Sequence, residues 1–261
     1  MIMTSNTNPV IKQARKIVTT AKARRQEGLF AAEGLRLCLD AAENGGVIHT
    51  LFVTPAFEQA FGAQAARIRA VAARTYTVSD GVMARLADTE SPQGVLCLCQ
   101  TPTYGRLPQQ GGRFAVLENL ADPANLGAIA RTAEALGING LLVCGGCEAY
   151  HPKALRASMG ALLRLPVFQA PVADALSALH ALGVTTYAAV VRQGEWAAGQ
   201  TVFEPACAVV IGNEANGLTP ATAAACRKRV TIPMAGRAES LNAAAAACIL
   251  LWEITNRGQS V

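Results

Sequence analysis

The feature that most constrains the fold is a series of short apolar runs that alternate with helical patterns after residue 113. The runs carry no charge, which is typical of strands buried on both faces. Such strands separated by helices predict an α/β fold, a parallel sheet covered on both sides. The expected strands are residues 114–117, 140–144, 187–191, 208–211 and 230–232, and the expected helices are 127–136, 153–163, 173–182 and 240–254.

The chain before this region has the pattern of a smaller α/β domain. Ser79 can cap a helix there, and residues 101–112 contain breakers without periodicity, which indicates a linker. Because 261 residues exceed the usual domain size of roughly 100 to 150, we expect two domains, residues 1–100 and 113–261. In the first domain we expect helices at 9–20 and 34–43 and strands at 30–33, 49–53, 75–78 and 94–100.

Positive charge is concentrated at the start of the chain. Residues 1–36 hold seven basic and two acidic side chains, which accounts for the formal net charge of +5. A basic segment of this kind predicts a polyanionic partner, with a solvated helix face as the alternative. Our candidates for phosphate contacts are Lys12, Arg15, Lys22, Arg24 and Arg25.

Composition also predicts the compartment. The longest uncharged apolar run, residues 243–252, is much shorter than the roughly 20 residues of a membrane span, and residues 1–9 lack a signal-peptide pattern. Most of the eight cysteines lie inside apolar runs, which favours buried thiols in a reducing compartment. Cys144 and Cys147 form a C-x-x-C near His151, but a structural zinc site needs four ligands and no second pair exists. We therefore expect a cytoplasmic protein without a metal.

The first loop with candidate chemistry leaves the strand 114–117 and enters a helix. Asn125 can cap that helix, and Arg131 follows within it, with its side chain directed back toward the helix N-terminus. A cation and free N–H groups would then converge on one spot, which suits a phosphate or a developing oxyanion. The alternative is ordinary capping.

The second and third loops follow the strands 208–211 and 230–232. The second lacks the spacing of a P-loop, and in it Glu214 could orient an arginine or a hydroxyl, or be a solvated turn residue. In the third, Ser240 is a candidate N-cap and Asn242 lies in the first turn of an apolar helix. Because the ligands of parallel sheets bind at the carboxyl ends of strands, all three loops are candidate sites.

The three loops, in this order, carry a family resemblance. N-x5-N-x-G-x3-R-T begins at Asn119, I-G-N-E-x2-G-L at Ile211 and I-P-M-x-G-x3-S-L-N at Ile232. They resemble the three motifs of the SpoU (TrmH) family of RNA ribose methyltransferases, within the SPOUT superfamily. The resemblance covers about residues 113–256, and residues 8–12 and 30–34 are similar to a substrate-binding domain, itself like a ribosomal protein, that many members carry.

The resemblance implies a SPOUT fold whose chain end threads a trefoil knot, with S-adenosylmethionine bound within it. It also implies a homodimer that pairs through the catalytic domain and its final helix, RNA as partner and no membrane. The cofactor-binding residues that it implies are Gly212, Asn213, Ile232, Met234, Ser240 and Leu241.

The implied reaction transfers a methyl group to a ribose 2′-hydroxyl. Arg131 corresponds to the arginine of the family's first motif, but a guanidinium is effectively never deprotonated in proteins. We interpret it as a group that orients the ribose and stabilises developing alkoxide charge, held by Glu214 and Asn125. Ser240 and Asn242 would complete the catalytic set. The family frequently has N-V-S where this chain has Asn242-Ala243-Ala244, so the contact that the family's serine could make in the site is lost here.

Ribosomal RNA is the expected substrate, because the N-terminal domain looks like that of members acting on ribosomal RNA. One alternative is 2′-O-methylation of transfer RNA. Two others are a SPOUT-type enzyme that methylates a base and a non-catalytic RNA-binding or ribosome-assembly protein.

Overall fold

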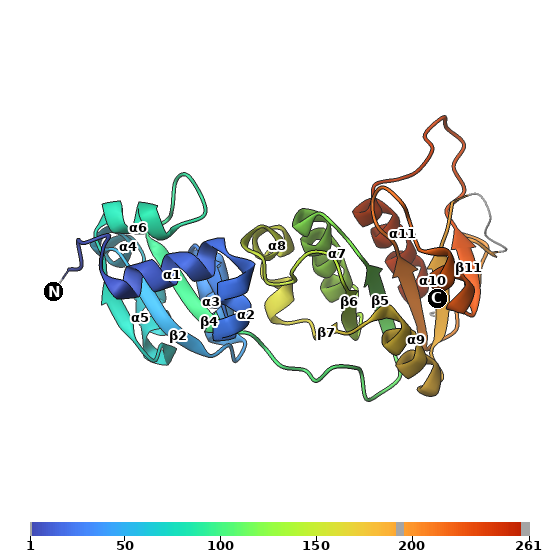
Figure 1. Ribbon diagram of the computed structural model, residues 1–261, viewed down its shortest axis with the longest axis horizontal. Helices are drawn as coiled ribbons and strands as arrows, with labels where there is room; N and C mark the ends of the chain where they lie inside the picture. Colours follow the sequence, from blue (N-terminus) through green and yellow to red (C-terminus); the bar gives the residue numbers. More distant parts are fainter. Residues whose placement is uncertain (1, 192–195, 257–261) are drawn as a thin grey trace. The chain divides into compact units, whose positions relative to one another are not determined.

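A computed structural model describes residues 2–191 and 196–256 of the chain (Figure 1). The chain forms two compact units, Met1–Thr103 with Tyr150–Leu163, and Tyr104–Ala149 with Arg164–Val261. Segment 150–163, placed in the second domain by the sequence analysis, thus groups with the first unit, where Tyr150 stacks on Phe30 with ring centroids 5.0 Å apart. Among the described residues, no helix has both the length and the hydropathy needed to span a bilayer.

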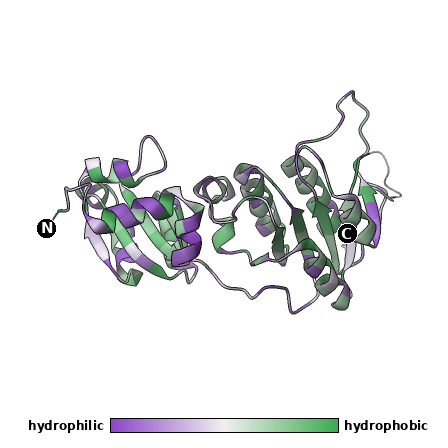
Figure 2. Ribbon diagram, viewed as in Figure 1, coloured by the Kyte–Doolittle hydropathy of each residue, from purple (hydrophilic) through white to green (hydrophobic). Residues whose placement is uncertain are grey.

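The first unit is built on a four-stranded sheet in the order β1-β4-β2-β3. β4 is antiparallel to β1 and β2, and β2 is parallel to β3. Helix α1 starts where the Asn8 side chain accepts the Val10 N–H, and it buries one apolar face in the core while its polar face is visible in Figure 2. The strands are β1 (Leu29–Glu33), β2 (Ile48–Val53), β3 (Thr75–Thr77) and β4 (Val95–Gln100), and the helices are α1 (Pro9–Thr19), α2 (Ala21–Glu27), α3 (Leu35–Glu43), α4 (Pro55–Ala60), α5 (Gly62–Val71), α6 (Asp80–Leu86), α8 (Pro152–Ser158) and the 3₁₀ turn η1 (Ala161–Leu163).

The second unit is the expected parallel sheet. Its seven strands run in the order β7-β6-β5-β10-β8-β11-β9, and every pairing between them is parallel. The central strands are strongly hydrophobic in Figure 2, as strands covered on both faces must be. The strands are β5 (Arg113–Glu118), β6 (Gly140–Cys144), β7 (Val167–Gln169), β8 (Thr185–Ala189), β9 (Trp196–Ala197), β10 (Cys207–Ile211) and β11 (Lys228–Thr231), and the helices are α7 (Pro123–Ala135), α9 (Val172–Ala181), α10 (Pro220–Ala225) and α11 (Ala243–Asn256).

Three expected helices differ from the observed ones by three or more residues at one end, and the others differ by at most one residue at either end. The helix expected at 153–163 stops at Met159, whose left-handed backbone (φ 52°) is followed by Gly160 at φ 90°. α7 begins four residues before the expected start, with Pro123 in its first turn and Asp122 as its N-cap, so the prediction of Asn125 as the cap was wrong. α11 begins three residues after the expected start. Ser240 is therefore not its N-cap, and Asn242 takes that place.

Candidate active site

The three loops singled out in the sequence lie at one edge of the parallel sheet. They follow β5, β10 and β11, and β10 pairs directly with β5, placing Ile211 opposite Leu117. β8 separates β10 from β11. Because all these strands are parallel, their carboxyl ends meet at the same edge, as expected for an α/β ligand site.

A buried carboxylate, which the sequence analysis missed, ties the first loop to the second. Glu118, the last residue of β5, is 3% exposed and accepts three hydrogen bonds from residues around the start of α10. Thr219 donates its N–H and its hydroxyl, each at 2.9 Å, and Thr222 donates its hydroxyl at 2.6 Å. Charge-assisted bonds of this kind hold the end of the second loop against β5.

The second loop folds back on itself in a tight turn. Asn213 and Gly217 exchange backbone hydrogen bonds, and a Cβ added to Gly212 would lie 2.1 Å from the carbonyl carbon of Gly217. Only glycine therefore allows this close approach. The Asn213 side chain accepts the Ala215 N–H at 3.0 Å and donates to the Asn119 carbonyl at 2.9 Å, so it shapes the turn and links it to the first loop.

Glu214 projects from this turn onto the first loop. Its carboxylate accepts the N–H groups of Ala121 at 2.9 Å and Asp122 at 3.0 Å, and the side-chain amide of Asn125 at 2.9 Å. Burial by itself would raise the pKa of Glu214, but these donors outweigh it and lower the pKa below its usual value. Glu214 is thus an ionised anchor for the loop.

Asn242 brings the third loop into the same network. Its Oδ1 accepts the N–H groups of Ala244 and Ala245, which caps α11, and its Nδ2 donates to Oδ1 of Asn125 at 3.2 Å. A continuous chain of hydrogen bonds therefore runs from Asn242 through Asn125 to Glu214, one residue from each loop.

Arg131 and Ser240 lie outside this network. Arg131 is exposed on α7 and forms no hydrogen bond or ion pair with any residue that the structure describes. The prediction that Glu214 and Asn125 hold Arg131 was therefore wrong, because Glu214 uses its oxygens on the loop backbone and Asn125 instead. Ser240 is exposed at the rim of a pocket.

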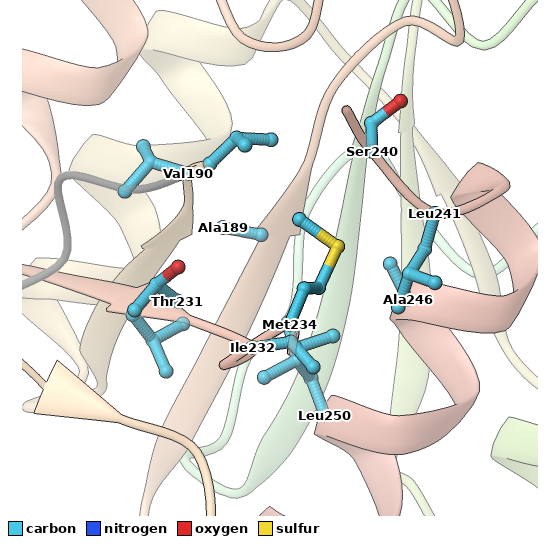
Figure 3. Close-up of a pocket in the computed structure, with 11 residues that line it drawn as sticks. Ala189, Val190, Thr231, Ile232, Met234, Ser240, Leu241, Ala246 and Leu250 are labelled. Carbon is cyan, nitrogen blue, oxygen red and sulfur yellow. The ribbon is translucent and has the colours of Figure 1, made fainter. Parts of the chain in front are cut away.

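That pocket lies beside the network, between the ends of β8 and β11 and the start of α11 (Figure 3). The side chain of Met234 projects between Thr231 on one side and Leu241 on the other. The pocket has an empty volume of about 430 Å³, which includes its open mouth, and its lining is mostly apolar. Its lining is Ala189, Val190, Val191, Val230, Thr231, Ile232, Met234, Ser240, Leu241, Ala246 and Leu250.

Four of the six expected cofactor-binding residues line this pocket, namely Ile232, Met234, Ser240 and Leu241. Gly212 and Asn213 do not line it, and they build the neighbouring turn instead. The wall formed by β8 and by Leu250 was not predicted from the sequence. The apolar stretch 187–191 was identified only as a strand.

The C-x-x-C has the chemistry of buried thiols. Burial raises the pKa of Cys144 to about 12 and that of Cys147 to about 11, so both thiols are protonated at neutral pH. Within residues 2–191 and 196–256, no group of three potential metal ligands comes together.

The basic candidates of the first unit divide into two groups. Lys12, Lys22 and Arg25 are exposed, as a phosphate contact requires. Arg24 is only 6% exposed and donates to the carbonyls of Ile17 and Val18 at the end of α1, so the structure contradicts its assignment to RNA. Arg15 is half-buried and donates to the carbonyls of residues 86 and 87 at the end of α6.

Together, a parallel α/β sheet and an apolar pocket beside a polar network at its carboxyl edge are the arrangement of an α/β protein that binds an organic ligand. The sequence model of the SpoU rRNA methylase family matches residues 112–252, more than half of the chain, and the model of the MRM3-like substrate binding domain matches residues 8–97. The chain therefore belongs to the SpoU rRNA methylase family.

Individual relatives match over nearly the whole chain. An uncharacterized tRNA/rRNA methyltransferase of Synechocystis sp. is 34% identical, covering 96% of this chain and 92% of its own length. The 23S rRNA (uridine(2479)-2′-O)-methyltransferase of Streptomyces viridochromogenes is 31% identical over 94% of this chain and 89% of its own. The crystal structure of an AdoMet-bound rRNA methyltransferase from Sinorhizobium meliloti superimposes with a TM-score of 0.88 at 31% identity, covering 100% of this chain and 99% of that one. The expected family and α/β fold class are confirmed.

Proposed function

We propose that this protein transfers a methyl group from S-adenosylmethionine to a ribose 2′-hydroxyl of ribosomal RNA. The observation that carries the proposal is the chain of hydrogen bonds from Asn242 through Asn125 to Glu214, because it joins all three loops beside one apolar pocket. The relatives named as RNA methyltransferases, one of them bound to AdoMet, support it.

The lining of the pocket suits AdoMet, the cofactor bound in the related structure from Sinorhizobium meliloti. Ile232, Leu241 and Leu250 give apolar walls for the adenine and the methionine chain, and Met234 lies among them (Figure 3). When bound, S-adenosylmethionine supplies an electrophilic methyl group on a sulfonium sulfur. Backbone groups of the turn after β11, near Met234, would hold the adenine edge and fix its orientation.

The side chains of the site act by positioning the ribose, and none of them is suited to remove the proton of its 2′-hydroxyl. Glu214 is ionised, but its oxygens already accept three hydrogen bonds, and the amides of Asn125 and Asn242 are not bases. Transfer of the methyl group to the ribose oxygen would release the hydroxyl proton, and because none of these side chains is a suitable base, that proton would leave to water. Arg131, exposed and free of protein partners among the described residues, orients the ribose and its phosphate and stabilises the developing negative charge on oxygen.

We assign the delivery of RNA to residues 1–100 and catalysis to residues 113–261, with 101–112 as the linker. The last five residues of the catalytic part lie outside the described residues. Lys12, Lys22 and Arg25 are the exposed phosphate contacts of the first part. Since RNA is the substrate and the described cysteines are free thiols, we place the protein in the cytoplasm.

We further propose a homodimer that pairs through α11, and a trefoil knot at the end of the catalytic part. Along α11, Ile249 is 39% exposed and Trp252 is 56% exposed, so two large apolar side chains lie on the exposed face of a helix whose opposite face is buried. Exposed apolar side chains of this kind are typical of a subunit contact. Analytical ultracentrifugation should give twice the chain mass for the wild type and a single chain mass for Trp252→Glu, and a monomeric wild type would refute the dimer.

The activity is tested with ribosomal RNA from cells that lack the gene. The wild type should incorporate tritiated methyl groups from S-adenosylmethionine at one ribose, which ribose-methylation mapping identifies, whereas Arg131→Ala should lose at least a hundredfold in rate with unchanged cofactor affinity in calorimetry. Arg131→Lys keeps the positive charge but lacks the planar guanidinium group, and its rate of methyl transfer should lie between those of the wild type and Arg131→Ala. Near-normal turnover by Arg131→Ala would refute the assignment. Methylation of transfer RNA alone, or no binding of S-adenosylmethionine, would favour the alternatives of a transfer-RNA enzyme or a non-catalytic protein.

A further inference from the structure

At one end of the sheet of the first unit, the side chains on one face change from apolar to polar. On the face covered by α1, each strand presents every second side chain, and these rows form the core through Phe52, Leu96, Leu98 and Val78. At the end of each row the next position on the same face is polar, buried at Thr50 and exposed at Gln100 and Arg74. Thr50 ends the row of β2, Gln100 that of β4 and Arg74 that of β3.

A hollow lies at this end of the sheet, beyond the apolar core. It encloses about 1,080 Å³ including its open mouth, and α1 contributes Gln13 to it. The ring of Tyr76 forms part of its wall and stacks on Phe52, with centroids 5.7 Å apart and an angle of 22° between the planes. His49 also lines it, with its Nδ1 2.8 Å from the hydroxyl of Thr50. Apart from the buried Thr50 and the half-buried Tyr76, the polar side chains that line the hollow are exposed, so a ligand from solvent can reach them.

A second hollow adjoins the first between α1 and α2. It shares Gln13, Ile17 and Glu27 with the first, and it adds the cations Lys12 and Lys16, which stand one helical turn apart on α1. The first hollow therefore offers an aromatic ring, amide groups and the guanidinium of Arg74, the second offers two ammonium groups, and the carboxylate of Glu27 lines both.

We propose that this double hollow binds one unpaired nucleotide of the RNA, an inference that rests on the proposed function. The base lies against Tyr76 and extends the stack with Phe52, while Gln13, Gln100 and Glu27 provide acceptors and donors for its edge. Lys12 and Lys16 hold the flanking phosphates. A paired base cannot enter, because its ring faces are covered by neighbouring base pairs, so the site selects a loop, bulge or single strand.

The test uses the full-length protein and a twelve-nucleotide single-stranded RNA with a central 4-thiouridine, compared with a fully paired hairpin of the same composition. Irradiation should crosslink the thiouridine to peptides that contain Tyr76 or Gln100. Tyr76→Leu keeps apolar volume on Phe52 but removes the ring, and it should weaken single-strand binding about fivefold or more with little effect on the hairpin. The matched control Tyr104→Leu, in the second unit and outside both hollows, should bind as the wild type does.

Two further variants separate the base site from the phosphate site. Gln100→Glu preserves size but adds a negative charge to the hollow, and it should weaken binding even if Tyr76→Leu fails to fold. Lys16→Ala should lower the slope of log affinity against log salt by about 0.7, as expected for one lost phosphate contact on a single strand.

Crosslinks to other peptides, or Tyr76→Leu and Gln100→Glu binding as tightly as the wild type, would overturn the inference. Methyl transfer is measured on the same preparations to keep the two proposals apart. A wild type that methylates RNA while both variants bind normally refutes only the nucleotide site. A wild type that crosslinks through the hollow without methylating refutes only the proposed activity.

Discussion

Replacing Glu118 by glutamine tests whether a buried carboxylate holds the candidate site together. One carboxylate oxygen accepts the hydroxyls of Thr219 and Thr222, and the other accepts the Thr219 N–H. In Glu118→Gln the amide oxygen can replace the first of these acceptors. The amide NH₂ group then faces the Thr219 N–H, so two hydrogen-bond donors oppose each other and the bond from the Thr219 N–H is lost.

The expected loss follows from that single contact. A hydrogen bond to a charged group contributes about 1.5–3 kcal/mol. Burying a neutral amide costs less than burying a carboxylate, which offsets part of the loss, so we expect about 1.5 kcal/mol. For a unit of this size, 1 kcal/mol shifts the melting temperature by roughly 2–4 °C, which gives a decrease of roughly 3–6 °C.

Differential scanning calorimetry on the full chain measures this shift. Glu239→Gln, at an exposed carboxylate, is the control and should melt like the wild type. Thr222→Val removes one donor from the same carboxylate, so the double variant with Glu118→Gln should lose less than the sum of the two single variants. A melting temperature of Glu118→Gln within 1 °C of the wild type, or strict additivity, would refute the reasoning.

Three further predictions concern the neighbouring loops. Gly212→Ala should destabilise the protein by about 1–3 kcal/mol in urea unfolding, because its Cβ would overlap Gly217; equal stability would contradict the close approach. Asn242→Ala should cost about 1 kcal/mol through the lost cap of α11, and Asn242→Asp should restore most of it in the same assay. The folded-state pKa of Glu214 is below 4.5, so its stabilisation is present above pH 4.5 and is lost as the pH falls through the folded-state pKa. Glu214→Gln should therefore flatten the decrease in stability between pH 5 and 3, and an unchanged pH profile would show that the carboxylate is not anchored.

Much of the second unit could be predicted because buried parallel strands have a strong signal. The strand at 140–144 was predicted with its observed bounds. The run is uncharged, has the length of a strand and ends at a pair of glycines, which marks its boundary. β7 and β9 have three and two residues, too few for a periodicity to be visible, and they were missed. The break of the helix at Met159 was missed for a different reason. Its left-handed backbone at the C-cap runs against local preference, since methionine is a good helix former and rarely has a positive φ.

The site was predicted less completely than the fold. The loops were located by their motifs, but the partners within them lie far apart in sequence, 89 residues between Asn125 and Glu214 and 117 between Asn125 and Asn242. No local pattern reports such a contact. Glu118 was missed although it had a signal, a lone carboxylate at the end of a buried strand, where an ionised group requires several donors.

The network divides the candidate residues into two kinds. Glu214, Asn125 and Asn242 use their polar atoms on one another and on the backbone, so they fix the loops before any substrate binds. The donors around Glu214 favour its ionised form and lower its pKa, which makes it a poor general base. Arg131 has its donors available, and only such a residue can form new bonds as charge develops on the ribose oxygen. Loss of a network residue should therefore lower cofactor affinity and stability together, whereas loss of Arg131 should lower the rate alone.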